Sequence, residues 1–248
     1  MHTESFTVGK NKAMVLCYLH DDKAKRPSAI VLPGGGYRVL SAKHKDPVVF
    51  PLLSHGFQVF LLCYSVSEGI KTSSPEEELA ITVREIKRRS CEFHADTERI
   101  ILAGASAGGH LAASLAVHWP LYGEESRPSA ALLSYPVITM GKYTHQGTAE
   151  RITAMDEDLL SYYSLETQVD ENTVPCFIWH TAQDAVADVR NSLLFYSALL
   201  DKGVPAEIHI YHEGKHGLVM GRAETGKEMK SVQNWFPLAL RWLEGRWG

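Results

Sequence analysis

The sequence contains few cysteines, and they are widely scattered. No two of the four have the C-x-x-C spacing that is typical of zinc or redox sites, and no N-x-S/T glycosylation sequon is present. The spacing argues against a structural metal and against a disulfide framework. These absences together favour a reducing, cytoplasmic location. The cysteines are Cys17, Cys63, Cys91 and Cys176.

Long apolar runs are also missing. No run approaches the length of about 20 residues that a membrane-spanning helix needs. The first five residues, Met1 to Ser5, show neither the basic region nor the apolar region of a secretory signal. We therefore expect no signal peptide and no membrane partner.

Charge of one sign is not in excess. The chain has 25 Lys and Arg against 29 Asp and Glu, a formal net charge of −4. No basic cluster is large enough to follow a phosphate backbone, so we expect no nucleic-acid partner. A length of 248 residues with 45% hydrophobic residues suits one large globular domain over residues 1–248. No sequence pattern indicates the oligomeric state.

Short apolar runs alternate with helical patterns along the chain. This alternation predicts a mostly parallel sheet with helices on both faces, a three-layer α/β/α fold. Residues 137–173 interrupt it with only weak helical signals around 155–163, which predicts either a small cap over the site or an ordinary surface excursion. The expected strands are 13–19, 29–32, 57–63, 99–103, 130–135, 176–180 and 207–211, and the expected helices are 75–91, 109–118, 189–200 and 228–243.

The most informative motif is G-x-S-x-G, with Ser106 between Gly104 and Gly108. It lies between an apolar strand pattern and an Ala- and Leu-rich helical pattern. That context predicts a sharp turn that exposes the serine hydroxyl to a substrate carbonyl, with a helix N-terminus favouring negative charge nearby. The alternative is a purely structural turn in which the serine caps the helix.

Two later strands supply partners for this serine. Asp184 follows the strand ending at residue 180, and His216 follows the strand ending at residue 211. The order Ser106, Asp184, His216 is the one expected for an α/β nucleophile-elbow enzyme. Asp188 competes as the acid, but it is better placed to cap the following helix.

The loop around His216 also matches the zinc-peptidase pattern H-E-x-x-H, from His212 to His216. That pattern binds zinc only when both histidines share one face of a helix. Here a strand precedes the motif, and Gly214 and Gly217 interrupt it. We therefore expect no metal site.

A glycine loop follows the strand that ends at residue 32. Residues 34–36 are all glycine, which lets the backbone present N–H groups without interference from Cβ atoms. We predict an oxyanion hole made by the N–H groups of Gly35, Gly36 and Ala107. A flexible loop is the alternative, whereas a phosphate loop is disfavoured because no G-K-[ST] ending follows.

With these residues placed, the chain resembles the α/β-hydrolase superfamily. It is most similar to small esterases of the acetyl-xylan-esterase and hormone-sensitive-lipase branches, including feruloyl-esterase-like members. It departs from them at Pro33, where the family's glycine loop commonly begins with histidine, and at residues 187–189, where V-P-V is common. The shared motifs are Leu32-Pro33-Gly34-Gly35-Gly36-Tyr37, Tyr64-Ser65-Val66, the run from Gly104 to Ala112, Ser134-Tyr135-Pro136-Val137, the run from Trp179 to Asp184, and Gly214-Lys215-His216-Gly217.

The resemblance implies a doubly wound, eight-stranded fold and hydrolysis of small carboxylic esters, with short acyl groups and acetylated sugars as substrates. No metal or organic cofactor is expected. Tyr37, His110 and Tyr143 are candidate pocket residues, with packing as their alternative role. A prolyl-type peptidase and a non-catalytic binding protein are the competing functions. The peptidase is disfavoured because the sequence shows no added domain that would select peptides. The binding protein is disfavoured because it would not need the complete triad that the sequence contains.

Overall fold

A single eight-stranded sheet runs through the molecule. The computed structural model describes residues 1–247, apart from the side chains of residues 68 and 69. The strand order is β1-β2-β4-β3-β5-β6-β7-β8. Strand β2 is antiparallel to both of its neighbours, β1 and β4, and the six strands from β4 to β8 in this order, β3 included, are parallel to one another. The strands are β1 (His2–Val8), β2 (Ala13–Leu19), β3 (Arg26–Leu32), β4 (Gln58–Cys63), β5 (Ala95–Ala105), β6 (Ala130–Ser134), β7 (Cys176–Thr181) and β8 (Ala206–Tyr211).

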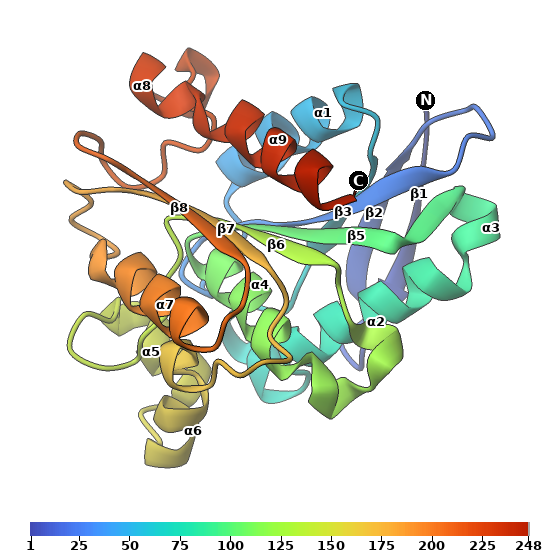
Figure 1. Cartoon of the computed structure of the whole chain (residues 1–248). Helices are drawn as coiled ribbons and strands as arrows, with labels where there is room; N and C mark the ends of the chain where they lie inside the picture. Colours follow the sequence, from blue (N-terminus) through green and yellow to red (C-terminus); the bar gives the residue numbers. More distant parts are fainter. Residues whose placement is uncertain (248) are drawn as a thin grey trace.

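Helices cover both faces of the sheet (Figure 1), as the alternation of patterns predicted. One face carries α1 (Asp46–Ser54), α8 (Lys230–Gln233) and α9 (Trp235–Trp247). The other carries α2 (Pro75–Arg88), α3 (Ser90–Phe93), α4 (Ala107–His118) and α7 (Arg190–Asp201), with α5 (Gln146–Thr153) and α6 (Glu157–Tyr162) beside them. The three-layer α/β/α prediction is confirmed. Within residues 1–247, no helix is both long and apolar enough to cross a bilayer.

Each face of the sheet has its own hydrophobic core. Leu111 of α4 and Phe195 of α7 are fully buried against one face, and Leu52 of α1 and Trp235 of α9 against the other. Trp179 of β7 stacks on Trp235 with ring centroids 5.3 Å apart. Each such side chain contributes roughly 1.5–3 kcal/mol by leaving water, so both helix layers are held firmly against the strands.

Two predicted helices are divided in the structure. The helix expected over 75–91 ends at Arg88, and the short α3 follows it. It begins with Ser74 at the N-cap and Pro75 at the first helical position. The helix expected over 228–243 is split into α8 and α9 at Asn234.

The strand order brings four loops to one edge of the sheet. The strands β3, β5, β6, β7 and β8 are parallel neighbours, so their carboxyl ends meet there. Ligand sites in open parallel sheets form at this edge. The loops after β3, β5, β7 and β8 carry all of the residues that the sequence singled out for catalysis.

Candidate active site

Ser106 occupies a strained turn between β5 and α4. Its backbone has φ 56° and ψ −119°, a conformation that non-glycine residues rarely adopt. The neighbouring glycines make the turn possible. A Cβ on Gly104 would lie 2.2 Å from the carbonyl oxygen of Gly108, and one on Gly108 would lie 2.0 Å from that of Leu32. The motif therefore permits close approach of three backbone segments.

The three predicted catalytic side chains form a continuous hydrogen-bonded chain. His216 Nε2 lies 2.8 Å from Ser106 Oγ, and His216 Nδ1 lies 2.6 Å from Asp184 Oδ2. Ser106 follows β5, Asp184 follows β7 and His216 follows β8. With Nδ1–H donated to the carboxylate, the Nε2 lone pair faces the serine hydroxyl, which is the arrangement that lets an imidazole accept the hydroxyl proton.

Asp184 is buried but extensively hydrogen-bonded. Its Oδ1 accepts the N–H groups of Val186 and Ala187 at 2.9 and 3.0 Å. His180 Nε2 lies 3.3 Å from Oδ2, the oxygen that faces His216. Burial alone raises the pKa of Asp184, but the hydrogen bonds from His180 and His216 outweigh it and hold that pKa well below its usual range. The carboxylate therefore stays charged and can stabilise an imidazolium.

The competing acid, Asp188, points elsewhere. Its Oδ1 accepts the N–H of Arg190 at 2.8 Å, and its Oδ2 lies 2.8 Å from the same residue's guanidinium. It thus lies at the start of α7, near the capping position that the sequence suggested. Its hydrogen bonds are local and involve none of the triad residues.

The glycine loop after β3 lies beside Ser106. Gly35 and Gly36 have φ 138° and 62°, and a Cβ on Gly35 would lie 1.9 Å from the carbonyl oxygen of Val39. Within the described part of the chain, the N–H groups of Gly35 and Gly36 have no acceptor. The N–H of Ala107 is unpaired because it opens α4. These three N–H groups are therefore free to donate hydrogen bonds.

Two buried residues to which the sequence analysis gave no role hold these loops together. His44 Nδ1 accepts the N–H of Gly34 at 2.9 Å, and His44 Nε2 lies 3.2 Å from the hydroxyl of Tyr135. That hydroxyl accepts the N–H of Val219 at 3.2 Å, and the Tyr135 ring packs edge-on against His216 with centroids 5.0 Å apart. His44 and Tyr135 thus connect the glycine loop to the loop of the proposed base. No motif includes His44, because a buried histidine cannot be told from an exposed one in a single sequence, and the motif that contains Tyr135 does not reveal its contacts.

A cavity of about 490 Å³ opens above the serine. Gly35 and Gly36 of the glycine loop line it, as do Ser106 and His216. None of the three predicted pocket residues, Tyr37, His110 and Tyr143, is part of its lining. Tyr37 and His110 are fully buried and hydrogen-bond to each other at 3.0 Å in the core, while Tyr143 packs under the guanidinium of Arg190. These contacts are typical of packing residues.

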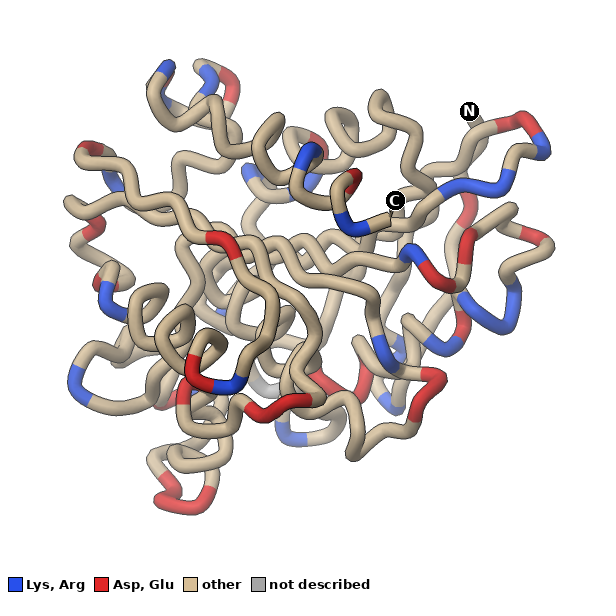
Figure 2. The backbone as a smooth tube through the Cα atoms, viewed as in Figure 1, with Lys and Arg blue, Asp and Glu red and all other residues tan. Residues whose placement is uncertain are grey.

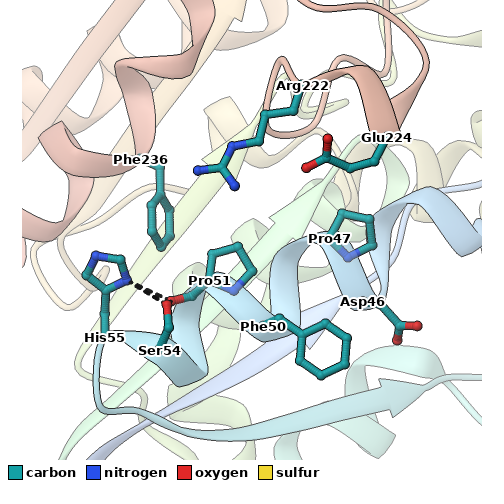
Figure 3. Close-up of a pocket in the computed structure, with 9 residues that line it drawn as sticks. All are labelled: Asp46, Pro47, Phe50, Pro51, Ser54, His55, Arg222, Glu224 and Phe236. Carbon is teal, nitrogen blue, oxygen red and sulfur yellow. Dashed lines mark hydrogen bonds between the residues drawn. The ribbon is translucent and has the colours of Figure 1, made fainter.

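A second cavity, of about 510 Å³, lies between α1 and the segment around η6 (Ala223–Thr225) (Figure 3). It also contains a serine next to a histidine, Ser54 and His55, whose side chains are 3.3 Å apart. Both side chains are directed at the carbonyl oxygen of Pro51, at 2.8 Å each. His55 Nδ1–H is donated to that carbonyl, and no carboxylate orients the ring. This pair therefore has no means of activating its serine.

The H-E-x-x-H segment lies in the loop after β8 rather than on a helix. His212 is exposed, whereas His216 is directed at Ser106 and Asp184. Among residues 1–247, no group of three or more His, Cys, Asp or Glu side chains is arranged to hold a metal ion.

Several solved structures share this fold over nearly their whole length. An acetyl ester-xyloside bifunctional hydrolase from Caldicellulosiruptor lactoaceticus is 29% identical with a TM-score of 0.88, and covers 98% of this chain and 96% of its own. A carboxylesterase from Lactobacillus plantarum is 27% identical with a TM-score of 0.89, and covers 99% and 98%. These neighbours place the chain among α/β-hydrolases.

Similar sequences point the same way. The chain is 35% identical over 223 residues to endo-1,4-beta-xylanase B of Butyrivibrio fibrisolvens and 28% identical over 218 residues to an acetylxylan esterase of Xylanibacter ruminicola. Each match covers 85% of this chain but only 35% and 44% of the relative, so the chain spans less than half the length of either. A BD-FAE family model matches residues 16–121, and a model of the prolyl oligopeptidase family matches residues 83–241. The chain thus belongs to the prolyl oligopeptidase family within the α/β-hydrolase superfamily, and it resembles the acetylxylan esterases.

Proposed function

We propose that the protein is a serine esterase that removes short acyl groups, acetyl above all, from small sugars or xylo-oligosaccharides. The hydrogen-bonded chain from Ser106 through His216 to Asp184, beneath unpaired N–H groups of the glycine loop, is the observation that carries this proposal. The names of the acetylxylan esterase and the acetyl ester-xyloside hydrolase relatives support the substrate class.

The geometry suits an acyl-enzyme mechanism. Ser106 Oγ attacks the ester carbonyl while His216 Nε2 takes its proton, and the N–H groups of Gly35, Gly36 and Ala107 hold the oxyanion. His216 then gives the proton to the leaving alcohol, which leaves the acyl group on Ser106. Water attacks this ester with His216 again as the base, and release of the acid restores the serine.

In this proposal, residues 137–173 form a small cap over the active site. Gly147 and Arg151 of α5 line the cavity, and α6 follows in the same segment. We place these elements as a small cap on a single domain. We also propose a cytoplasmic setting, where the enzyme meets small oligosaccharides rather than polymeric xylan, because its four cysteines are unpaired.

The family match keeps one competing function, prolyl-type peptide hydrolysis, in view. A peptidase that acts at a free amino terminus must bind a positively charged substrate. The charged side chains that line the cavity are Arg38, Lys43 and Arg151, all of the wrong sign for this task. We therefore favour the esterase. A panel of proline 4-nitroanilides beside acetyl, butyryl, octanoyl and feruloyl esters separates the two, and a preference for octanoyl esters or anilides would count against our proposal.

Replacement of the nucleophile tests the mechanism. We expect Ser106→Ala to lower kcat for 4-nitrophenyl acetate by about 10⁴-fold or more, because the acyl-enzyme cannot form. Ser54→Ala is the matched control, since Ser54 also lies beside a histidine in a cavity but only donates to Pro51. Circular dichroism checks that both variants fold. Unchanged turnover by Ser106→Ala would refute the assignment.

A further inference from the structure

The cavity above Ser106 is charged with one sign only. Arg38, Lys43 and Arg151 line it, and no aspartate or glutamate does. Over the rest of the backbone, acidic and basic residues are interspersed (Figure 2). The three cations are therefore a local feature of the cavity, and we call them the cationic rim.

The cationic rim is assembled from separate segments. Arg38 follows the glycine loop, Lys43 lies in η1 (Ala42–His44) and Arg151 lies in α5. Arg38 and Lys43 are exposed, whereas Arg151 is half-buried and donates to the carbonyl oxygens of Gly36, at 3.2 Å, and Gly147. Carbonyl groups leave the guanidinium charge in place. Across the described residues, none of the three cations has a carboxylate within ion-pair distance.

Neighbouring histidines respond to this positive charge. Burial is the main cause that lowers the pKa of His44 to about 4, and electrostatic interactions with His216 and the Lys43 ammonium lower it further. The pKa of His145 is lowered mainly by burial and further by His216 and Arg151, while Asp184 and Glu150 partly oppose this. Lys43 and Arg151 thus add positive charge beside these two rings, and positive charge on the cavity wall favours an anion in the cavity.

We propose that the sugar ester accepted by this site carries an anionic group, a carboxylate or a phosphate, that binds the cationic rim while its acetyl group lies over Ser106. This inference rests on the proposed esterase function and specifies its substrate class. The guanidinium of Arg38 offers a forked donor that matches either anion, and the ammonium of Lys43 adds a point charge. An O-acetylated uronic acid supplies the carboxylate, and an O-acetylated sugar phosphate supplies the other anion.

Paired substrates test the proposal. We expect a kcat/KM about tenfold higher for acetylated methyl glucuronide than for acetylated methyl glucoside, since two exposed ion pairs each contribute a few-fold. A parallel pair, acetylated glucose 6-phosphate and acetylated glucose, shows which anion is preferred. The ratio within each pair falls as sodium chloride rises from 0.05 to 0.5 M, because salt screens exposed charges.

A double variant tests the residues. Arg38→Gln combined with Lys43→Gln is expected to bring the anionic-to-neutral ratio close to one, because neither glutamine carries a charge and the remaining cation, Arg151, is held by the carbonyl groups of Gly36 and Gly147. Lys23→Gln is the matched control, since Lys23 is an exposed cation between β2 and β3 and does not line the cavity. It is expected to keep the ratio of the unmodified enzyme.

The outcomes separate this inference from the proposed function. Hydrolysis of both neutral and anionic acetyl sugars at a ratio of one or below, or a ratio insensitive to salt and to the double variant, would overturn the inference and leave the esterase intact. If the unmodified enzyme hydrolyses neither 4-nitrophenyl acetate nor any acetyl sugar, the esterase proposal fails and the inference fails with it.

Discussion

At the scale of single residues, the environment of Asp184 defines its proposed role. Its Oδ1 is fixed by two backbone N–H groups, so Oδ2 is held toward His216 at 2.6 Å. His180 contributes a further contact from β7. Because the carboxylate is constrained on both sides, it can determine which ring nitrogen of His216 carries the proton. An aspartate held only by exposed contacts, such as Asp188, could not determine which ring nitrogen carries the proton.

The two aspartates allow a matched test. We expect Asp184→Asn to lower kcat for 4-nitrophenyl acetate by about 10³- to 10⁴-fold, because an amide at this position no longer selects the Nδ1–H tautomer. Asp188→Asn is expected to stay within about twofold of the unmodified enzyme, since its contacts stop at Arg190. Steady-state kinetics on both variants decides the point. A larger loss of kcat in Asp188→Asn than in Asp184→Asn would show that Asp188, and not Asp184, is the catalytic acid.

Much of the site was predictable from sequence because its parts are local. Each triad residue, Ser106, Asp184 or His216, follows a strand. The glycine loop is recognisable in the sequence by its three consecutive glycines. The residues that hold these parts together were not predictable. His44 contacts Tyr135 across 91 positions of sequence, and no periodicity or spacing reports such a contact.

At the scale of elements, two of the elements that the sequence did not predict, helix α1 and strand β1, have physical explanations. The helix α1 contains Pro47 and Pro51. Because a proline inside a helix removes a hydrogen bond, the sequence pattern did not predict a helix here. Pro47 lies in the first turn, where proline is tolerated, and burial of Val49 and Leu52 against the sheet stabilises the rest. The edge strand β1 is mostly exposed and polar, so it lacks the apolar run that marked the central strands.

The proposed cap is tied to the main domain through Glu76 of α2, which is 2% exposed. Tyr162 of α6 donates to its Oε1 at 3.0 Å, His118 Nδ1 of α4 lies 3.2 Å from the same oxygen, and Ser114 donates to Oε2. The ring of Tyr162 also stacks on His118 with centroids 4.1 Å apart. One buried carboxyl group therefore connects α2, α4 and α6.

We expect Glu76→Ala to lower the free energy of unfolding by about 3 kcal/mol, because it removes the hydrogen-bond partner of the buried Ser114 and His118 and of the half-buried Tyr162. Urea denaturation followed by fluorescence measures this. Glu77→Ala, one position along the same helix, removes an equal charge from a less buried site and is expected to change stability by less than about 0.5 kcal/mol. Equal effects of the two substitutions would show that the buried network does not hold the cap.

At the scale of the whole molecule, buried neutral histidines connect stability to pH. His44 lies between the glycine loop and Tyr135, and His110 lies in the core, where Tyr37 donates to its Nδ1 and its Nε2 lies 3.2 Å from the carbonyl oxygen of Tyr163. Burial is the first cause that lowers the pKa of each from 6.5 to about 4. Both rings therefore stay neutral in the folded protein over a range in which the unfolded chain is protonated.

The sign of the effect follows from proton binding. Between pH 6.5 and about 4 the unfolded state binds more protons than the folded state, so the free energy of unfolding falls as the pH falls. The loss approaches about 3 kcal/mol for each histidine at pH 4. Urea denaturation at pH 7, 5.5 and 4.5 measures the slope. We expect His110→Asn to reduce that slope by about half relative to the unmodified protein, whereas His212→Gln, at an exposed position, leaves it unchanged. A stability that stays constant from pH 7 to 4.5 would mean that neither ring is held neutral by the fold.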